Sequence, residues 1–135
     1  EQLASLRAIG LPLGIAFQLR DDLLGVFGDP EVTGKPAGDD LREGKRTVLI
    51  ALAQQELPAT AIRLMDELLG DPDLDEDQIA MLQATLTNTG AVDKLEQVID
   101  EQVLLAQKAI ASAGFSELAT AGLTQLAALV SQRAS

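Results

Sequence analysis

The residues best suited to metal chemistry are two adjacent carboxylates, Asp21 and Asp22, in the segment FQLRDDLLGVFGDP. On a helix, Phe17 and Gln18 precede them by one turn, so an aromatic ring, an amide and two acids share one side. Neighbouring carboxylates repel each other and belong either on a solvated face or around a cation. The pair alone leaves both interpretations open.

A glycine-rich segment follows the two acids and carries the lysines Lys35 and Lys45. Lysine supplies a point charge for phosphate oxygens, and glycine lets the backbone approach a ligand closely. Mg²⁺ prefers one or two carboxylates and completes its octahedron with water and phosphate oxygens. The chain contains no histidine, and we find no nucleophile paired with a base. This pattern predicts a diphosphate bridged by magnesium, with cations stabilising the diphosphate as it departs.

The elements that position these residues are predicted to be helices, because apolar residues recur at three- and four-residue steps and nothing suggests a sheet. Asp75 has the spacing of a helix cap with Gln78 at the third helical position, which we favour over a calcium loop. Three glycines are expected at helix C-caps, namely Gly70, Gly90 and Gly114. The spacing predicts a loop at 28–38 and helices over 2–27, 41–54, 58–69, 76–88, 91–112 and 116–132. The predicted fold class is all-α.

Composition limits the partners and the compartment. The net charge of −11 argues against nucleic acid or an anionic membrane as the main partner. The chain has no cysteine, and its longest apolar run, residues 48–53, is too short to cross a bilayer. We therefore expect a cytoplasmic protein without disulfides and with no obligatory membrane partner. Since Glu1 falls within an apolar-periodic run, residues 1–135 are interpreted as a single helical domain that is a fragment of a longer chain.

Residues 14–47, GIAFQLRDDLLGVFGDPEVTGKPAGDDLREGKRT, resemble the second aspartate-rich region of the trans-type isoprenyl diphosphate synthases. This is the family of the farnesyl and geranylgeranyl diphosphate synthases. The shared pattern is Phe-Gln, two residues, Asp-Asp, then Gly-Lys, two residues, Gly, one residue, Asp, three residues, Gly-Lys, one residue, Thr. Residues 51–135 agree with the family only in being helical.

The resemblance implies the C-terminal half of an isoprenoid-synthase-type helical bundle, in which two aspartate-rich helices face each other across a cavity. It also implies a Mg²⁺-dependent reaction, in which an allylic diphosphate ionises and isopentenyl diphosphate attacks the resulting cation. The region 14–47 then carries the second aspartate-rich motif and the diphosphate-binding loop. The first aspartate-rich motif is not found in this sequence. A homodimer is expected.

Three residues match positions of the family that carry the chemistry. Asp21 and Asp22 match acids that help to hold Mg²⁺, and Asp21 is expected to be the direct ligand. Lys35 matches a lysine that contacts the allylic diphosphate. The alternative for Lys35 is a surface lysine in a mobile loop.

Four further residues match substrate-binding positions. Gln18 matches a residue beside the allylic substrate, and Phe17 matches an aromatic residue near the isoprenoid tail. Lys45 matches the second lysine of the site, and Asp40 matches an acid near the metals. The structural alternatives are a Phe17 packed in the core, a surface lysine at Lys45, and Asp40 as the cap of helix 41–54.

Gly25 departs from the family pattern Asp-Asp-x-x-Asp, in which position 25 is the last acid. The glycine removes one oxygen ligand or water anchor, and we expect it to tune the metal site without abolishing it. The substitution Gly25→Asp is accordingly expected to tighten the Mg²⁺ requirement with little change in fold.

Two other functions remain open at this stage. A terpene cyclase would share the helical fold, but Lys35 and Lys45 in their Gly-Lys frames argue against it. A non-catalytic helical regulatory or interaction subunit of a prenyl synthase is the second alternative, and the acid missing at Gly25 lends it some support.

Overall fold

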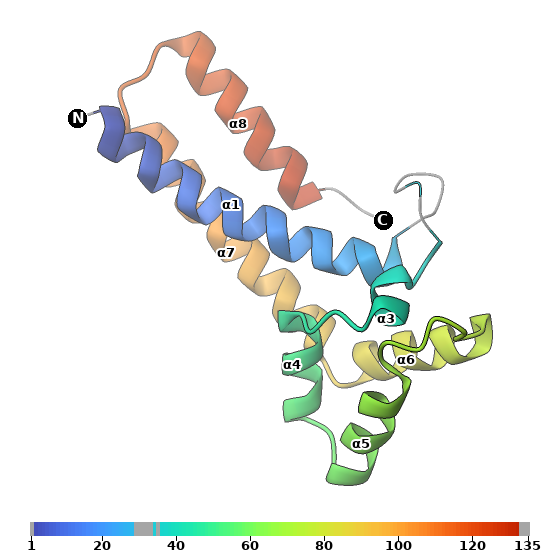
Figure 1. Ribbon diagram of the computed structural model, residues 1–135. Helices are drawn as coiled ribbons and strands as arrows, with labels where there is room; N and C mark the ends of the chain where they lie inside the picture. Colours follow the sequence, from blue (N-terminus) through green and yellow to red (C-terminus); the bar gives the residue numbers. More distant parts are fainter. Residues whose placement is uncertain (1, 29–33, 35, 133–135) are drawn as a thin grey trace. The chain divides into compact units, whose positions relative to one another are not determined.

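The computed structural model describes residues 2–28, 34 and 36–132, and these residues form α-helices and no strand (Figure 1). The predicted all-α fold is therefore confirmed. Within the described ranges, no helix combines the length and the apolar character that crossing a membrane requires. The helices are α1 (Gln2–Phe27), α3 (Asp39–Glu43), α4 (Val48–Gln55), α5 (Ala59–Leu68), α6 (Glu76–Asn88), α7 (Ala91–Ser112) and α8 (Glu117–Gln132).

The chain divides into two compact units. The first combines residues 1–20 with residues 96–134, and the second contains residues 21–95. Helices α1 and α7 each contribute to both units. The expectation of one helical domain over residues 1–135 stays a prediction.

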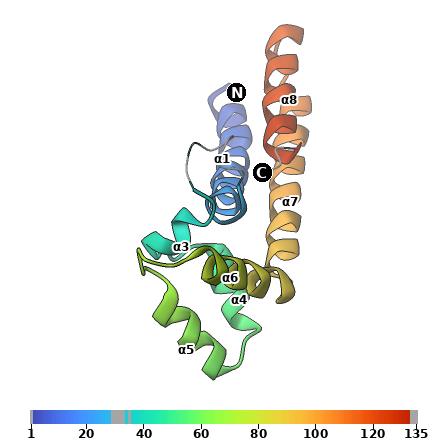
Figure 2. The ribbon, with the colours of Figure 1, turned by 90° about the vertical axis from the view of Figure 1, so that its right-hand side faces the viewer.

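The first unit is built from most of α1, most of α7, and α8. Figures 1 and 2 show the chain turning back after α7, so that α8 runs antiparallel to it. Apolar residues at three- and four-residue steps give each helix one buried face. The buried side chains are Ile9, Leu13, Ala16 and Leu19 of α1, Ile99, Val103, Ala106 and Ile110 of α7, and Ala127 and Val130 of α8.

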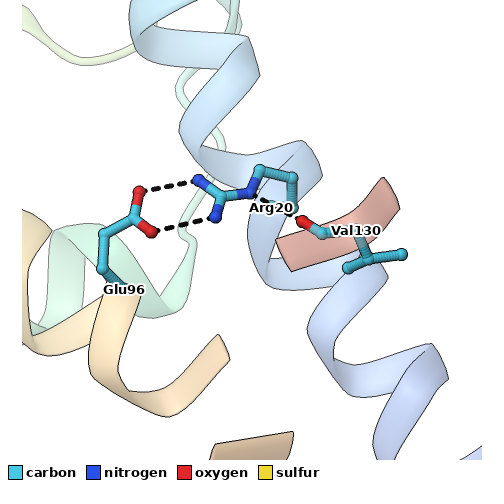
Figure 3. A network of polar contacts seen from close by, with 3 residues as sticks. All are labelled: Arg20, Glu96 and Val130. Atoms are coloured by element: carbon cyan, nitrogen blue, oxygen red, sulfur yellow. Dashed lines mark hydrogen bonds and ion pairs between the residues drawn. The ribbon is translucent and has the colours of Figure 1, made fainter. Parts of the chain in front are cut away.

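A buried arginine joins the three helices of this unit. The guanidinium group of Arg20 donates two parallel hydrogen bonds to Glu96, at 2.6 and 2.9 Å, and a third to the carbonyl oxygen of Val130 at 3.2 Å (Figure 3). The side chain of Arg20 is only 9% exposed, whereas that of Glu96 is 40% exposed. The fork of the guanidinium group suits the bidentate pairing with Glu96, which holds α1 against α7, and the third hydrogen bond holds α1 against α8.

The second unit contains the end of α1, helices α3 to α6, and the first turn of α7. Its core is formed by leucines and other aliphatic residues from all of these elements. Among the buried side chains are Leu24 and Val26 of α1, Leu41 of α3, Leu49 and Ile50 of α4, Met65 of α5, Leu82 and Leu86 of α6, and Leu95 of α7.

The predicted helix over 41–54 is wrong, because the chain forms two helices there, α3 and α4. Gly44 ends α3 with a positive φ of 72°, in the left-handed region that suits glycine. Thr47 then starts α4 by accepting a hydrogen bond from the backbone N–H of Ile50. A helix that continued through Gly44 would lose both the left-handed C-cap at Gly44 and the hydrogen bond from Ile50 to Thr47.

The remaining helices begin and end close to where their caps predict. Asp75 and Gln78 form the expected capping box at the start of α6. Gly70, Gly90 and Gly114 all have positive φ, and each follows a helix, as predicted. The helices predicted over 76–88 and 91–112 match α6 and α7 at both ends.

Candidate functional site

The two adjacent acids of α1 differ in their exposure. Asp21 is exposed, whereas Asp22 is only 8% exposed. One turn earlier on the same helix, Gln18 is exposed and Phe17 is 46% exposed. A Phe17 packed in the core is therefore ruled out for this chain. The oxygens of Asp21 are thus accessible and those of Asp22 largely covered, and the direct role of Asp21 in binding a metal stays a prediction.

The carboxylates of Asp21 and Asp22 are chemically suited to Mg²⁺, which prefers oxygen donors and keeps most of its shell for water and phosphate. Among the described residues, no group of three or more His, Cys, Asp or Glu side chains comes together as a complete metal site. A cation held by Asp21 and Asp22 would need its remaining oxygens from a ligand and from water.

Asp40 and Lys45 form the ion pair of the region. The Nζ atom of Lys45 lies 3.2 Å from Oδ1 of Asp40 and 3.7 Å from Oε2 of Glu43. The hydrogen bond to Asp40 and the negative charge of its carboxylate are the main reasons why the pKa of Lys45 is raised above its ordinary value. The interpretation of Asp40 as a helix cap is wrong, because the N-cap of α3 is Gly38 and Asp40 lies within the helix.

Gly25 lies directly against this ion pair. A Cβ atom placed at Gly25 would overlap Oδ2 and Cγ of Asp40 and would lie 2.8 Å from Oδ1. The carboxylate of Asp40 thus fills the space in which a side chain at position 25 would start. The expectation that Gly25→Asp makes little change in fold stays a prediction, and it requires the Asp40 carboxylate to shift, because the new side chain would overlap it and place a second carboxylate beside it.

Helix α3, which carries Asp40, is fixed at both ends. At its start, Gly38 is buried, and a Cβ atom there would lie 2.5 Å from the side chain of Ile79. At its end, the N–H of Gly70 donates to the carbonyl of Leu41 at 2.9 Å. Nε of Arg42 also donates to the carbonyl of Leu74 at 3.1 Å. These contacts determine where Asp40 meets α1.

The C-terminal end of α1 has a side-chain partner that sequence reasoning missed. Nε2 of Gln83 donates to the carbonyl oxygen of Val26 at 2.6 Å, which satisfies one of the carbonyls left open at a helix end. Helix α6 thereby holds the segment just after the two acids. Since 57 residues separate the partners, no local signal could have revealed the contact.

A shallow pocket of 310 Å³ adjoins α3 and α6, and none of the predicted site residues lines it. Its lining residues are Pro36, Ala37, Arg42, Glu76, Ile79 and Gln83.

The described part of the second unit contains four of the predicted site residues, Asp21, Asp22, Asp40 and Lys45. Among them, Asp40 and Lys45 form an ion pair, and Asp40 also lies against Gly25. Lys35 lies outside the described residues. Phe17 and Gln18 belong to the first unit, and their relation to the acids is that of neighbouring turns on α1. Neither the contact of Asp40 with Gly25 nor the buried Arg20 was predicted from the sequence.

The family model described as Polyprenyl synthetase matches residues 1–86. The geranylfarnesyl diphosphate synthase of Aeropyrum pernix is 43% identical over 88 residues, which cover 65% of this chain and 26% of that protein. The (2E,6E)-farnesyl diphosphate synthase of Mycobacterium tuberculosis is 57% identical over 44 residues, covering 33% of this chain and 12% of that protein.

Solved structures of enzymes match almost the whole length of this chain. The geranylgeranyl pyrophosphate synthase of Corynebacterium glutamicum, crystallised with isoprenyl diphosphate and magnesium, matches with a TM-score of 0.91 and 40% identity. The match covers 97% of this chain and 37% of that one. A polyprenyl synthase of Caulobacter crescentus, crystallised with calcium and isoprenyl diphosphate, matches with a TM-score of 0.80 and 33% identity over 97% of this chain and 40% of that one.

The chain thus spans less than half the length of these relatives. The matched residues 1–86 include the two acids of α1, then Gly25, and then the ion pair of Asp40 with Lys45. The chain therefore belongs to the polyprenyl synthetase family.

Proposed function

We propose that this chain supplies the second aspartate-rich region of a trans-type prenyltransferase, which condenses isopentenyl diphosphate with an allylic diphosphate. The observation that carries the proposal is the family match over residues 1–86, together with an exposed Asp21 on α1. The relatives are named as isoprenyl diphosphate synthases, and one was crystallised with isoprenyl diphosphate and magnesium.

Asp21 and Asp22 are the residues that would hold Mg²⁺. When bound, the cation would neutralise the negative charge that builds up on the departing diphosphate. The exposed Asp21 would bind the cation directly. The buried Asp22 is the next residue on the same helix and would contribute its negative charge close to the cation.

The lysines would bind the diphosphate oxygens. Lys45 keeps its side chain half-exposed although it is paired with Asp40, and it can therefore reach an anionic ligand. Lys35 would contact the allylic diphosphate. The exposed Phe17 would lie along the isoprenoid tail, and Gln18 beside the allylic carbon atoms. We further propose a cytoplasmic homodimer.

A chimera tests this function. Residues 1–135 would replace the matching segment of the Corynebacterium glutamicum enzyme, which has the same fold over 97% of this chain. The chimera should incorporate radiolabelled isopentenyl diphosphate into longer products in a Mg²⁺-dependent manner. The parent enzyme and the unmodified 135-residue chain are the controls, and the chain alone should form no product.

A folded but inactive chimera would favour the non-catalytic alternative, in which this chain is an interaction subunit. Formation of cyclic hydrocarbons without incorporation of isopentenyl diphosphate would instead favour a terpene cyclase. Measurable elongation by the 135-residue chain alone would show that the site has been misplaced.

A further inference from the structure

We propose that Gly25, by lacking a side chain, leaves the space that the Asp40 carboxylate occupies, and we call this space the socket. Asp40, held there, pairs with the Lys45 ammonium group until an anionic ligand replaces the carboxylate. The identity of that ligand as a diphosphate rests on the proposed function. The socket itself rests only on contacts within the second unit.

The first step is the space around the glycines of α1. An added Cβ atom would meet nothing within 4 Å at Gly10 or Gly14, whereas at Gly25 it would overlap the Asp40 carboxylate. Glycine weakens a helix relative to alanine. Gly25 differs from the other two glycines, because a side chain there would take the space of the Asp40 carboxylate.

The second step is that contacts at both of its ends hold α3 in place against a larger residue at position 25. Gly44 lies against Gly70, where a Cβ atom would be 2.8 Å from the Cα atom of Gly70. The hydrogen bond from Gly70 to Leu41 and the buried Gly38 hold the same helix. A side chain at position 25 would therefore displace the Asp40 carboxylate from the place where it lies 3.2 Å from Nζ of Lys45.

The third step concerns Lys45, which is tied to Asp40 twice. Its backbone N–H donates to the carbonyl of Asp40 at 3.1 Å, and its Nζ atom lies 3.2 Å from the carboxylate. The Asp40 side chain is 10% exposed, while that of Lys45 is 50% exposed. The carboxylate is thus held within the protein, and the ammonium group remains accessible to a ligand that competes for it.

A double-mutant cycle on the 135-residue chain tests the socket. Gly25→Ala should lower the thermal unfolding midpoint, although alanine favours helix formation. The matched control Gly14→Ala, on the same helix with open space around it, should raise the midpoint. Combining Gly25→Ala with Asp40→Ala should recover the loss, because the carboxylate no longer occupies the space.

The socket is wrong if Gly25→Ala raises the midpoint as Gly14→Ala does, or if the effects of Gly25→Ala and Asp40→Ala are additive. Should Gly25→Ala alone fail to fold, refolding in the double variant would still support the socket. Failure of both variants, with Asp40→Ala alone folded, would contradict it.

Calorimetric binding of metal-free inorganic diphosphate tests the exchange. Asp40→Asn keeps the shape of the side chain but releases Lys45, and should bind this probe up to about fivefold more tightly than the unmodified chain. Glu43→Gln is the matched control, because it removes the same charge from the more distant and more exposed partner of Lys45. Its effect should be smaller.

Equal affinities for Asp40→Asn and Glu43→Gln would overturn the exchange, because a general charge effect would then explain both. Absence of diphosphate binding in every variant would contradict the proposed function and the exchange together. The unfolding cycle would still decide the socket separately.

Discussion

Arg20, the residue just before the two acids, stabilises the fold through hydrogen bonds. Its guanidinium group is buried and joins α1 to Glu96 of α7 and to the carbonyl of Val130 in α8. The sequence gives no sign of this role, because Glu96 follows Arg20 by 76 positions. Asp21 and Asp22, in contrast, stand out in the sequence as candidate metal ligands by their type and spacing, although their different exposures depend on the fold.

Replacing Arg20 should destabilise the chain. We expect Arg20→Ala to lower the free energy of unfolding by about 2 kcal/mol, since it removes hydrogen bonds to a charged group and leaves the Val130 carbonyl without this donor. Urea unfolding followed by circular dichroism measures the change. Arg7→Ala, which removes an exposed arginine from the same helix, should stay within about 0.5 kcal/mol. Equal effects of the two substitutions would show that the Arg20 contacts contribute nothing.

Helices α6 and α7 were predicted with correct ends because their signals are local, such as the Asp75 capping box. The division between α3 and α4 was missed, although Gly44 and Thr47 carry the local signals of a helix end and a helix start. What local periodicity could not show is that Gly44 approaches Gly70, which lies far along the chain. Asp40 was interpreted as a helix cap because the predicted helix began after it, whereas α3 begins at the residue before it.

The close approach of Gly44 to Gly70 predicts an unequal response to alanine at two helix ends. Gly44→Ala should cost about 3 kcal/mol, because a positive φ is unfavourable for alanine and the methyl group would meet the Gly70 backbone. Gly90→Ala has a positive φ but open space, and should cost only about 1 kcal/mol. Chemical unfolding compares the two variants, and indistinguishable losses would argue against the contact.

Asp66 of α5 is expected to make the stability of the second unit depend on acid pH. Hydrogen bonds from Arg46 and from Gln54 of α4 lower its pKa below the ordinary value of 3.8. A depressed pKa contributes stability above the unfolded value, and this contribution is lost as the pH falls through the folded value. The difference in unfolding midpoint between the unmodified chain and Asp66→Asn should therefore shrink below pH 3.8. A constant difference would contradict the assignment.

Considered as a whole molecule, the chain exposes many large apolar side chains in the first unit. Those on α1 are Leu3, Leu6, Leu11, Ile15 and Phe17, and those on α7 and α8 are Leu104, Leu105, Leu118, Leu126 and Leu129. Phe17, which the family resemblance places near an isoprenoid tail, is among these exposed side chains. Apolar surface of this extent is unusual for a soluble monomer.

The exposed side chains predict that the isolated 135-residue chain self-associates, most simply as a symmetric dimer. Sedimentation velocity over a concentration series measures this directly. Phe17→Ser combined with Leu6→Ser should weaken the association, whereas Leu64→Ser, on an exposed position of the second unit, should not. A strict monomer at every concentration would refute the prediction.

The central claim, that Asp21 belongs to a magnesium diphosphate site, is tested most directly by the turnover of the chimera with Asp21→Ala. At saturating Mg²⁺, turnover should fall by a factor on the order of a hundred or more, because losing the charge stabilisation of a leaving group costs about 3 kcal/mol. Asp22→Ala should cost less if Asp21 is the direct ligand. Equal turnover of the chimera with and without Asp21→Ala would contradict the account.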